Sequence, residues 1–323
     1  MRPAANSHRI SGARSSAGRR AAALLACVVL SASAACRSAA PESPYRAFAT
    51  PEAAVRALIE AVKAEKLDDV MAIFGPESQE LVAGSDPATA RGNRQVFTVA
   101  VTEAWQLVDD GPDRKTLIIG SESWPFPVPL IRDTAGWRFD TAAGKEEVIA
   151  RRIGRNELAA IRIARTYVAA QRQYAEQGHD GKPSGRFAQT FRSDPGKQNG
   201  LYWPSVRGQR RSPLGDLVAQ AAAEGRAPVD TARPSPFYGY YFKILTGQGA
   251  DAPGGAKSYL VGGEMSGGFA LVAWPADYDV TGVMTFLVNQ DGTVLEKDLG
   301  PETATVAGGI ALYNPDASWS PAE

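Results

Sequence analysis

Apolar side chains recur at helical spacing between Lys145 and Glu176. They are Ile153, Ala160, Ile161, Ala164, Val168 and Ala175, with Tyr167 and Tyr174 beside them. Intervals of three, four and seven residues place these side chains on one face of a helix, and most of the arginines lie elsewhere on it. The pattern predicts a long helix with one core face, ended by the glycines and proline between Gly178 and Gly185.

Gly154 interrupts this helical pattern. A glycine inside a helix costs about 1 kcal/mol relative to alanine, and Asn156 could cap a helix that starts again after it. We therefore expect either a kinked helix or two helices end to end.

The N-terminal half alternates between helical and strand patterns. Thr50, Pro51 and Glu52 are typical of a helix start, and Val55, Leu58, Ile59 and Val62 then form an apolar stripe. Further helices are predicted from Leu67 to Phe74 and from about Pro87 to Trp105. Strands are predicted at Thr116 to Ile119, Phe126 to Ile131 and Trp137 to Phe139. Helices that lead into an antiparallel sheet predict an α+β unit over residues 48–143.

The C-terminal half, residues 144–323, is predicted to be the long helix followed by an antiparallel meander. Strand patterns occur at Phe237 to Leu245, Leu260 to Val261, Phe269 to Trp274, Val283 to Val288 and Thr293 to Glu296. Between the last two strands, Asp291 and Gly292 favour a tight hairpin, because this pair accepts positive φ angles. The fold class predicted for the whole chain is α+β in two domains.

The first 35 residues have the layout of a secretory signal. Five arginines and no acid precede the apolar run Ala21 to Leu30, which is too short to span a bilayer, and small residues follow up to Cys36. Ala34, Ala35 and Cys36 resemble a bacterial lipoprotein signal, in which the cysteine is acylated. The alternative is ordinary cleavage before Cys36, which would leave a soluble periplasmic or secreted protein. Residues 36–47 are predicted to be a tether.

Removal of the signal changes the charge of the chain. The whole sequence has 35 basic and 35 acidic residues, and the mature chain would keep 30 basic residues, for a net charge near −5. This balance argues against nucleic acid as a partner. We expect the protein to touch the membrane through a lipid anchor only.

Few residues are suited to common catalytic or metal chemistry. His179 would be the mature chain's one imidazole, and we interpret it as a solvated loop residue. Zinc sites draw several ligands from Cys, His and acids, so we expect none. The turns at His179 to Lys182 and Asn289 to Gly292 each lack the acids of a calcium loop. The glycine pairs Gly262-Gly263 and Gly267-Gly268 lack the spacing of phosphate-binding loops. No catalytic residue, metal or cofactor is predicted.

A catalytic pair of carboxylates has no fixed spacing along the sequence, so a hydrolase remains an alternative. The acids in or near the predicted C-terminal sheet are Glu264, Asp277, Asp279 and Asp298. Each is more simply explained as a turn or strand residue.

Aromatic residues suggest a contact surface. Trp124, Trp203 and Trp274 each precede a proline, and flat rings with a polar edge suit stacking on sugars or peptides. In most such positions we expect the ring to fill a gap in the core. Tyr202 and Trp203, in a predicted loop, are the candidates for an exposed contact surface.

Three resemblances bear on fold and function. The bacterial domain-of-unknown-function 2950 family is resembled over nearly all of the mature chain, by the segments Arg151 to Ile161, Gly200 to Pro204, Ser212 to Gly215, Gly239 to Leu245, Gly267 to Tyr278 and Gly282 to Gly292. This resemblance implies an exported or lipid-anchored envelope protein without an assigned activity. The N-terminal half is similar to NTF2-like folds, and the C-terminal half is similar to the head domains of pilins and pseudopilins.

These observations favour a non-catalytic role. We expect an envelope lipoprotein, anchored through Cys36, that binds or helps to assemble another envelope protein or a cell-wall polymer. The alternative is a carboxylate-dependent hydrolase that acts on glycan or peptide.

Overall fold

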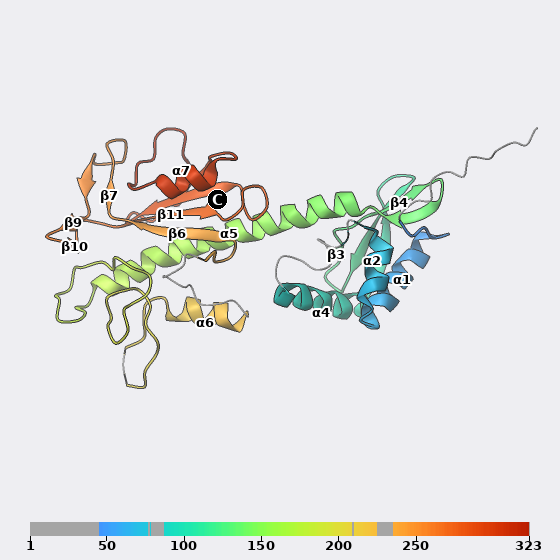
Figure 1. Cartoon of the computed structure of the whole chain (residues 1–323), viewed down its shortest axis with the longest axis horizontal. Helices are drawn as coiled ribbons and strands as arrows, with labels where there is room; N and C mark the ends of the chain where they lie inside the picture. Colours follow the sequence, from blue (N-terminus) through green and yellow to red (C-terminus); the bar gives the residue numbers. More distant parts are fainter. Residues whose placement is uncertain (1–44, 77, 79–86, 209, 225–234, 323) are drawn as a thin grey trace, which may run out of the picture. The chain divides into compact units, whose positions relative to one another are not determined.

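The structure is a computed structural model that describes residues 45–76, 78, 87–208, 210–224 and 235–322 (Figure 1). The predicted signal and Cys36 lie outside these residues, as does most of the tether. None of the helices in the described ranges combines the length and apolar content needed to cross a bilayer. The chain is α+β, as predicted, with helices and antiparallel sheets.

Three helices begin the described chain: α1 (Pro51–Lys63), α2 (Leu67–Phe74) and α4 (Pro87–Glu103). The α1 helix starts as predicted, because Thr50 Oγ1 accepts a hydrogen bond from the Ala53 amide at 3.2 Å and a proline occupies the first turn. Its buried face includes Val55 and Leu58. The predicted N-terminal helices are therefore present.

The first sheet has strands β1 (Trp105–Asp109), β2 (Arg114–Ile119), β3 (Trp124–Pro125), β4 (Leu130–Asp133) and β5 (Gly136–Phe139). All pairs are antiparallel in the order β1-β2-β4-β5, and β3 pairs with β2. The first core lies between this sheet and the helices, and it includes Leu58, Leu117 and Phe139.

Strands β1 and β3 were not predicted, and some boundaries in this unit differ from the predictions. The third helix ends at Glu103 rather than near Trp105, since Trp105 begins β1 and pairs with Ile119. The predicted strand from Phe126 does not become regular until Leu130. Pro127 and Pro129 explain the delay, because proline has no backbone N–H to donate to a sheet.

The long helix α5 (Thr141–Ala175) is continuous through Gly154, so the prediction of two helices end to end is wrong. Asn156 does not cap a second helix. Its side chain donates to Thr281 O at 2.8 Å, while Glu157 Oε1 accepts from the amide of Met284 at 3.0 Å. Because each such hydrogen bond contributes about 1 kcal/mol, these contacts offset the cost of the glycine.

The second sheet is an antiparallel meander, as predicted, but it does not include the predicted strand at Leu260 to Val261. Its strands are β6 (Tyr240–Leu245), β11 (Ala270–Pro275), β12 (Met284–Asn289), β13 (Leu295–Asp298) and β14 (Ser320–Pro321), each paired with the next. Two short pairs accompany it: β7 (Gly247–Gln248) with β8 (Lys257–Ser258), and β9 (Leu260–Val261) with β10 (Glu264–Met265). The helices α6 (Gly215–Ala223) and α7 (Thr303–Gly309) were not predicted.

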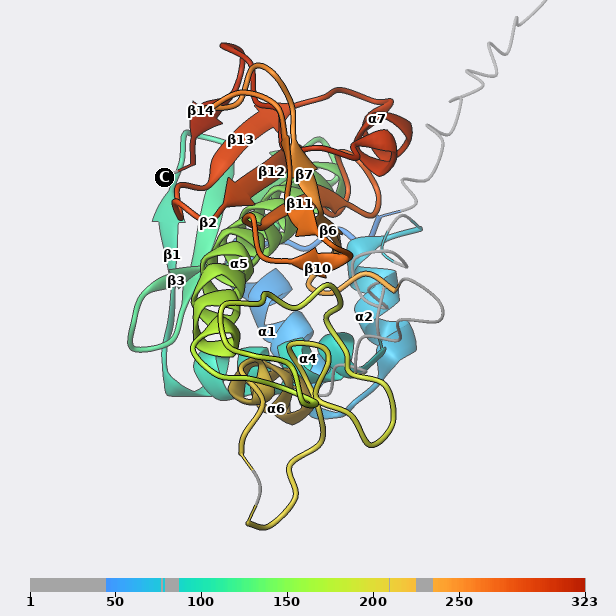
Figure 2. The same ribbon diagram turned by 90° about the vertical axis from the view of Figure 1, so that its left-hand side faces the viewer.

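The second core lies where α5 packs on this sheet (Figures 1 and 2). The hydroxyl of Tyr167 on α5 donates to Ala270 O on β11 at 3.1 Å. On β6, Lys243 Nζ donates to Gly308 O of α7 at 2.7 Å. The first and second cores are separate clusters of buried side chains. The predicted domain boundary between residues 143 and 144 stays a prediction.

Candidate functional site

The candidate site lies in residues 176–214, which join α5 to α6 and which we call the loop segment. Apart from Gln209, the structure describes all of it. The segment has almost no regular secondary structure, yet many of its backbone groups are paired. Phe187 N donates to Met265 O at 2.7 Å, and Arg192 and Tyr202 form an isolated parallel bridge. Contacts far apart in sequence therefore hold this loop in place.

Gln171, on α5, is the main side-chain anchor of the loop segment. It is fully buried. Its Nε2 donates to Ala188 O at 2.8 Å, and its Oε1 accepts from Ala188 N, also at 2.8 Å. The side-chain amide therefore pairs with both backbone groups of one residue, as a neighbouring strand would.

His179 is buried, so our interpretation of it as a solvated loop residue is wrong. Only 8% of its surface is exposed. Its ring stacks on Tyr174 with centroids 4.0 Å apart, and Nε2 lies 3.0 Å from Tyr174 O. Because a carbonyl oxygen only accepts, Nε2 carries a hydrogen. Sequence reasoning missed this burial because a glycine-rich loop gives no sign of the ring that covers it.

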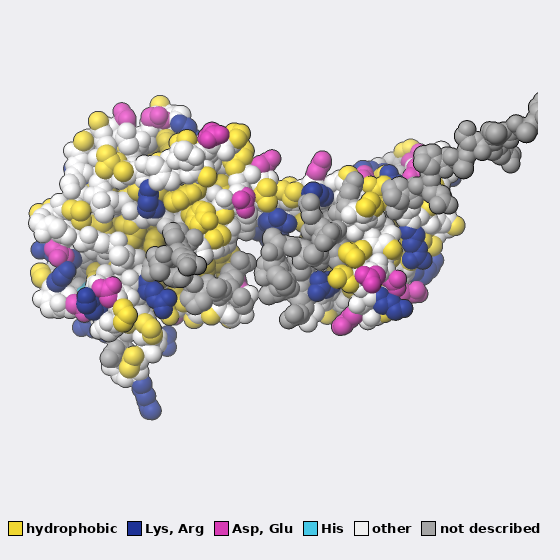
Figure 3. All heavy atoms as spheres, in the orientation of Figure 1, with side chains coloured by type: hydrophobic (Ala, Val, Ile, Leu, Met, Phe, Trp, Pro, Cys, Tyr) yellow, Lys and Arg dark blue, Asp and Glu magenta, His cyan; other side chains and the backbone are white. Residues whose placement is uncertain are grey.

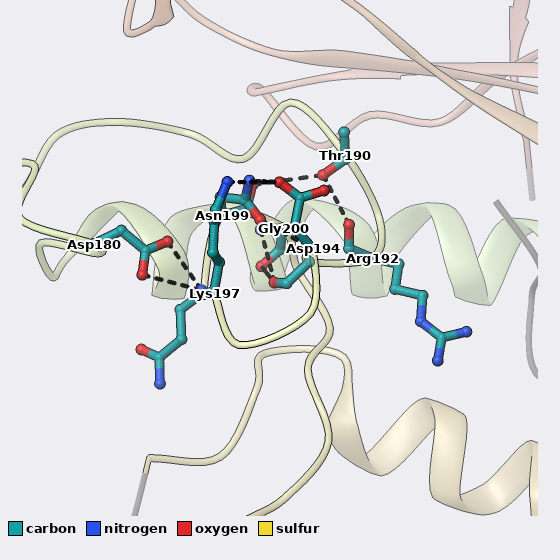
Figure 4. Close-up of polar contacts among 9 residues, drawn as sticks. Asp180, Thr190, Arg192, Asp194, Lys197, Asn199 and Gly200 are labelled. Carbon is teal, nitrogen blue, oxygen red and sulfur yellow. Dashed lines mark hydrogen bonds and ion pairs between the residues drawn. The ribbon is translucent and has the colours of Figure 1, made fainter. Parts of the chain in front are cut away.

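The carboxylate of Asp180 does not orient this imidazole. Both of its oxygens accept from the amide of Gln198, at 2.9 and 3.2 Å (Figure 4). Its negative charge acts on Tyr174 instead. Burial, followed by the charges of Asp180 and Glu264, raises the pKa of the Tyr174 hydroxyl to about 12. Tyr174 thus stays neutral at physiological pH and donates to Gln198 O at 2.9 Å.

Asp194 organises the tip of the loop segment (Figure 4). Its carboxylate accepts from Asn199 Nδ2 at 2.8 Å and from Lys197 Nζ at 3.1 Å. These two contacts, the Asn199 hydrogen bond first, lower the pKa of Asp194. The cluster is built from neighbouring residues, so it stabilises a turn.

Trp203 is buried, which corrects our expectation of an exposed ring. It is 4% exposed, belongs to the second core, and donates from Nε1 to Arg210 O at 3.1 Å. Tyr202 is half-buried and packs against the same core. The alternative for Trp-Pro positions, a ring that fills the core, therefore holds for Trp203. Trp124 has the opposite outcome, because it is 46% exposed beneath the guanidinium of Arg151.

A surface pocket of about 220 Å³ opens beside Trp203. Its lining consists of Gln173, Gln177, His179, Trp203, Arg210, Arg211 and Pro213. The guanidinium of Arg210 donates to Gln177 Oε1. Lys and Arg side chains, with some Asp and Glu, lie on the surface around the loop segment (Figure 3). The pocket brings His179 and Trp203 together with two arginines that the sequence did not single out.

Among the described residues, the four acids of the hydrolase alternative do not share a hydrogen-bond or ion-pair partner. Glu264 forms an ion pair with Lys182 at 2.8 Å, and Asp298 accepts from the Tyr278 hydroxyl at 3.3 Å. Asp277 and Asp279 are exposed. In the turn that begins at Asn289, the Asn289 side chain donates to the Asp291 carboxylate and accepts from the Asp291 backbone amide. Within the described ranges, no group of three or more His, Cys, Asp or Glu residues could hold a metal ion.

Comparison with known proteins identifies one family. A family model described as "Protein of unknown function (DUF2950)" matches residues 45–322. No curated protein and no solved structure matches the chain. The similarities to NTF2-like folds and to pilin heads therefore stay predictions.

Proposed function

The chain belongs to the DUF2950 family, and on that premise we propose that it is an exported envelope lipoprotein that binds another envelope protein or a cell-wall polymer. The anchor would be Cys36, after removal of residues 1–35. Binding would use the loop segment and its pocket. The protein would not catalyse a reaction.

The pocket beside Trp203 is the observation that carries this proposal. It is lined by guanidinium and amide groups next to two rings, and none of its seven described lining residues is acidic. Donor groups next to aromatic surface are typical of recognition sites. The imidazole of His179 donates its Nε2 hydrogen to the backbone carbonyl of Tyr174 at 3.0 Å. This contact favours a structural role for His179 over proton transfer.

Export supports the same proposal from the sequence. A cationic start, a short apolar run and small residues before Cys36 direct a chain across the bacterial inner membrane. One acylated cysteine with its diacylglyceride would then hold the protein at a membrane surface. A tether of about ten residues would let the folded part reach its partner.

The test captures partners in intact cells with a crosslinker and, in parallel, sediments the purified mature chain with isolated cell-wall polymer. A double variant, Arg210→Gln with Arg211→Gln, removes two pocket charges. Arg192→Gln with Arg207→Gln is the matched control, because it removes two exposed charges from the same loop segment. We expect capture to fall about tenfold or more for the pocket pair and to change less than twofold for the control.

Three results would contradict the proposal. Equal capture of both double variants would place the contact elsewhere on the molecule. A mature N-terminus without acyl mass at Cys36 would remove the anchor. Soluble fragments released from the polymer, and abolished by changing one acid such as Asp298, would favour the hydrolase alternative.

A further inference from the structure

Arg210 presents a prepositioned hydrogen-bonding group at the pocket. Its backbone carbonyl accepts from Trp203 Nε1 at 3.1 Å, and its guanidinium donates to Gln177 Oε1. The residue is therefore held at both ends. Its other guanidinium N–H groups have no partner among the described residues, so they remain available to a ligand.

Arg211 adds positive charge to the same pocket. Its partner Asp216 lies 3.9 Å away, and the two side chains are 85% and 97% exposed. An ion pair this long and this exposed is weak, so it leaves most of the guanidinium's hydrogen-bonding capacity free. None of the lining residues that the structure describes is acidic. The electrostatic potential of the pocket therefore favours an anion.

The size and walls of the pocket restrict what that anion can be. Pockets that hold whole small molecules measure about 300–1,000 Å³, and this one measures about 220 Å³. It therefore suits the end group of a larger ligand. Trp203, Pro213 and the ring of His179 supply an apolar wall. His179 Nδ1 is buried without a hydrogen-bond partner among the described residues.

From these features we infer that the pocket binds the C-terminal carboxylate of a peptide. The planar carboxylate accepts two parallel hydrogen bonds from a guanidinium, which Arg210 is placed to donate. The short side chain of the terminal residue lies against Trp203. This inference rests on the proposed function and names its ligand. A wall polymer and the end of an envelope protein both offer this group, and sedimentation with the polymer and crosslinking in cells distinguish the two sources.

The test is isothermal titration of the full mature chain with N-acetyl-alanyl-alanine, with its C-terminal amide and with inorganic phosphate. We expect the acid to bind at least about tenfold more tightly than the amide, because only the acid accepts charge-assisted hydrogen bonds. Phosphate binds more weakly than the acid, since it has no group to place against Trp203.

Variants locate the effect. Arg210→Gln weakens binding of the acid about tenfold or more, and Arg210→Lys recovers only part of the loss because an ammonium cannot make the paired contact. Arg207→Gln, an exposed residue of the same loop segment, is the matched control and changes affinity less than twofold. Circular dichroism of each variant confirms that it is folded.

Three outcomes overturn the inference: no binding of the acid, equal binding of acid and amide, or phosphate binding as tight as the acid. The proposed function survives any of these outcomes if the Arg210→Gln, Arg211→Gln double variant still captures less of the envelope partner than the control. Conversely, binding of the acid without any capture from cells or polymer rejects the proposed function and keeps the carboxylate site.

Discussion

The two hydrophobic cores differ in the polar groups that they bury. The first core is formed by side chains such as Leu58, Leu117 and Phe139, which lie on regular helices and strands. Around the second core, Gln171 and Gln248 are buried and hydrogen-bonded. Regular elements satisfy their own backbone groups, whereas an irregular loop needs side-chain partners for them. Gln171 thereby ties the second core to the loop segment that forms the candidate site, through Ala188.

The buried hydroxyls of the second core follow the same principle. Tyr259 donates to Gln248 Oε1 at 2.9 Å, and Gln248 Nε2 donates in turn to Pro253 O and Gly255 O at 2.9 and 2.7 Å. Burial, followed by the effects of Tyr313 and Asp291, raises the pKa of Tyr259 to about 12. A neutral hydroxyl therefore keeps this chain of hydrogen bonds intact at physiological pH.

The largest expected effect tests whether the two cores unfold separately. Phe139 is fully buried, and its ring centroid lies 5.1 Å from that of Phe74. Phe139→Ala should lower the free energy of unfolding of the first core by about 3–5 kcal/mol, because it leaves a cavity. Urea unfolding should show two transitions, of which this variant shifts only one.

Phe286→Ala is the matched change in the second core, where Phe286 is 1% exposed. It should shift the other transition by a similar amount. A single transition, moved equally by both variants, would reject the predicted division into two domains.

An intermediate effect is expected from the anchor of the loop segment. Gln171→Leu keeps the size of the side chain but leaves the buried N–H and C=O of Ala188 without partners. The free energy of unfolding of the second core should fall by about 2–4 kcal/mol. Limited proteolysis should also cut the loop segment faster.

Gln106→Leu, at an exposed position of β1, controls for the change of side-chain type. It should alter stability by less than about 0.5 kcal/mol. If the two variants behaved alike, the amide of Gln171 would not be what holds the loop.

The smallest expected effect concerns the helix that contributes to the second core. Gly154 lies inside α5, and a Cβ added there would meet no atom within 4 Å. Gly154→Ala should therefore stabilise the protein by about 0.5–1 kcal/mol, measured as a higher urea midpoint.

Gly154→Pro tests the continuity of α5 more strictly. In a continuous helix it should lower the free energy of unfolding by about 3 kcal/mol or more. Tolerance of proline at this position would instead support the broken helix that the sequence suggested.

Local patterns were sufficient to predict most of the regular elements. The cap at Thr50 and the stripe through Val55 and Leu58 specify α1, because helix starts and apolar faces depend on residues three and four positions apart. Alternation within strands specifies β12 and β13 in the same way, but the predicted tight hairpin at Asp291 and Gly292 is wrong, because the last paired residues are Leu287 and Leu295 and the connection is longer. Such signals lie within a few residues of the element that they define.

The candidate site could be predicted only in part. His179 and Trp203 stood out by residue type, but the sequence suggested a solvated histidine and an exposed tryptophan, and both side chains are buried. Arg210 and Arg211 carried no signal, since isolated arginines in a loop are common. Their arrangement depends on contacts such as Arg210 with Gln177, which are 33 residues apart.

The amino-acid sequence by itself determined the α+β class, the position of the long helix and the meander, because these follow from short-range periodicity and turn chemistry. Only the tertiary structure decided that α5 continues through Gly154, that Trp105 joins a strand and that Trp203 borders a pocket. Each of these outcomes depends on partners distant along the chain, such as Thr281 for Asn156. The free energy of such contacts outweighs local preference and leaves no pattern among neighbouring residues.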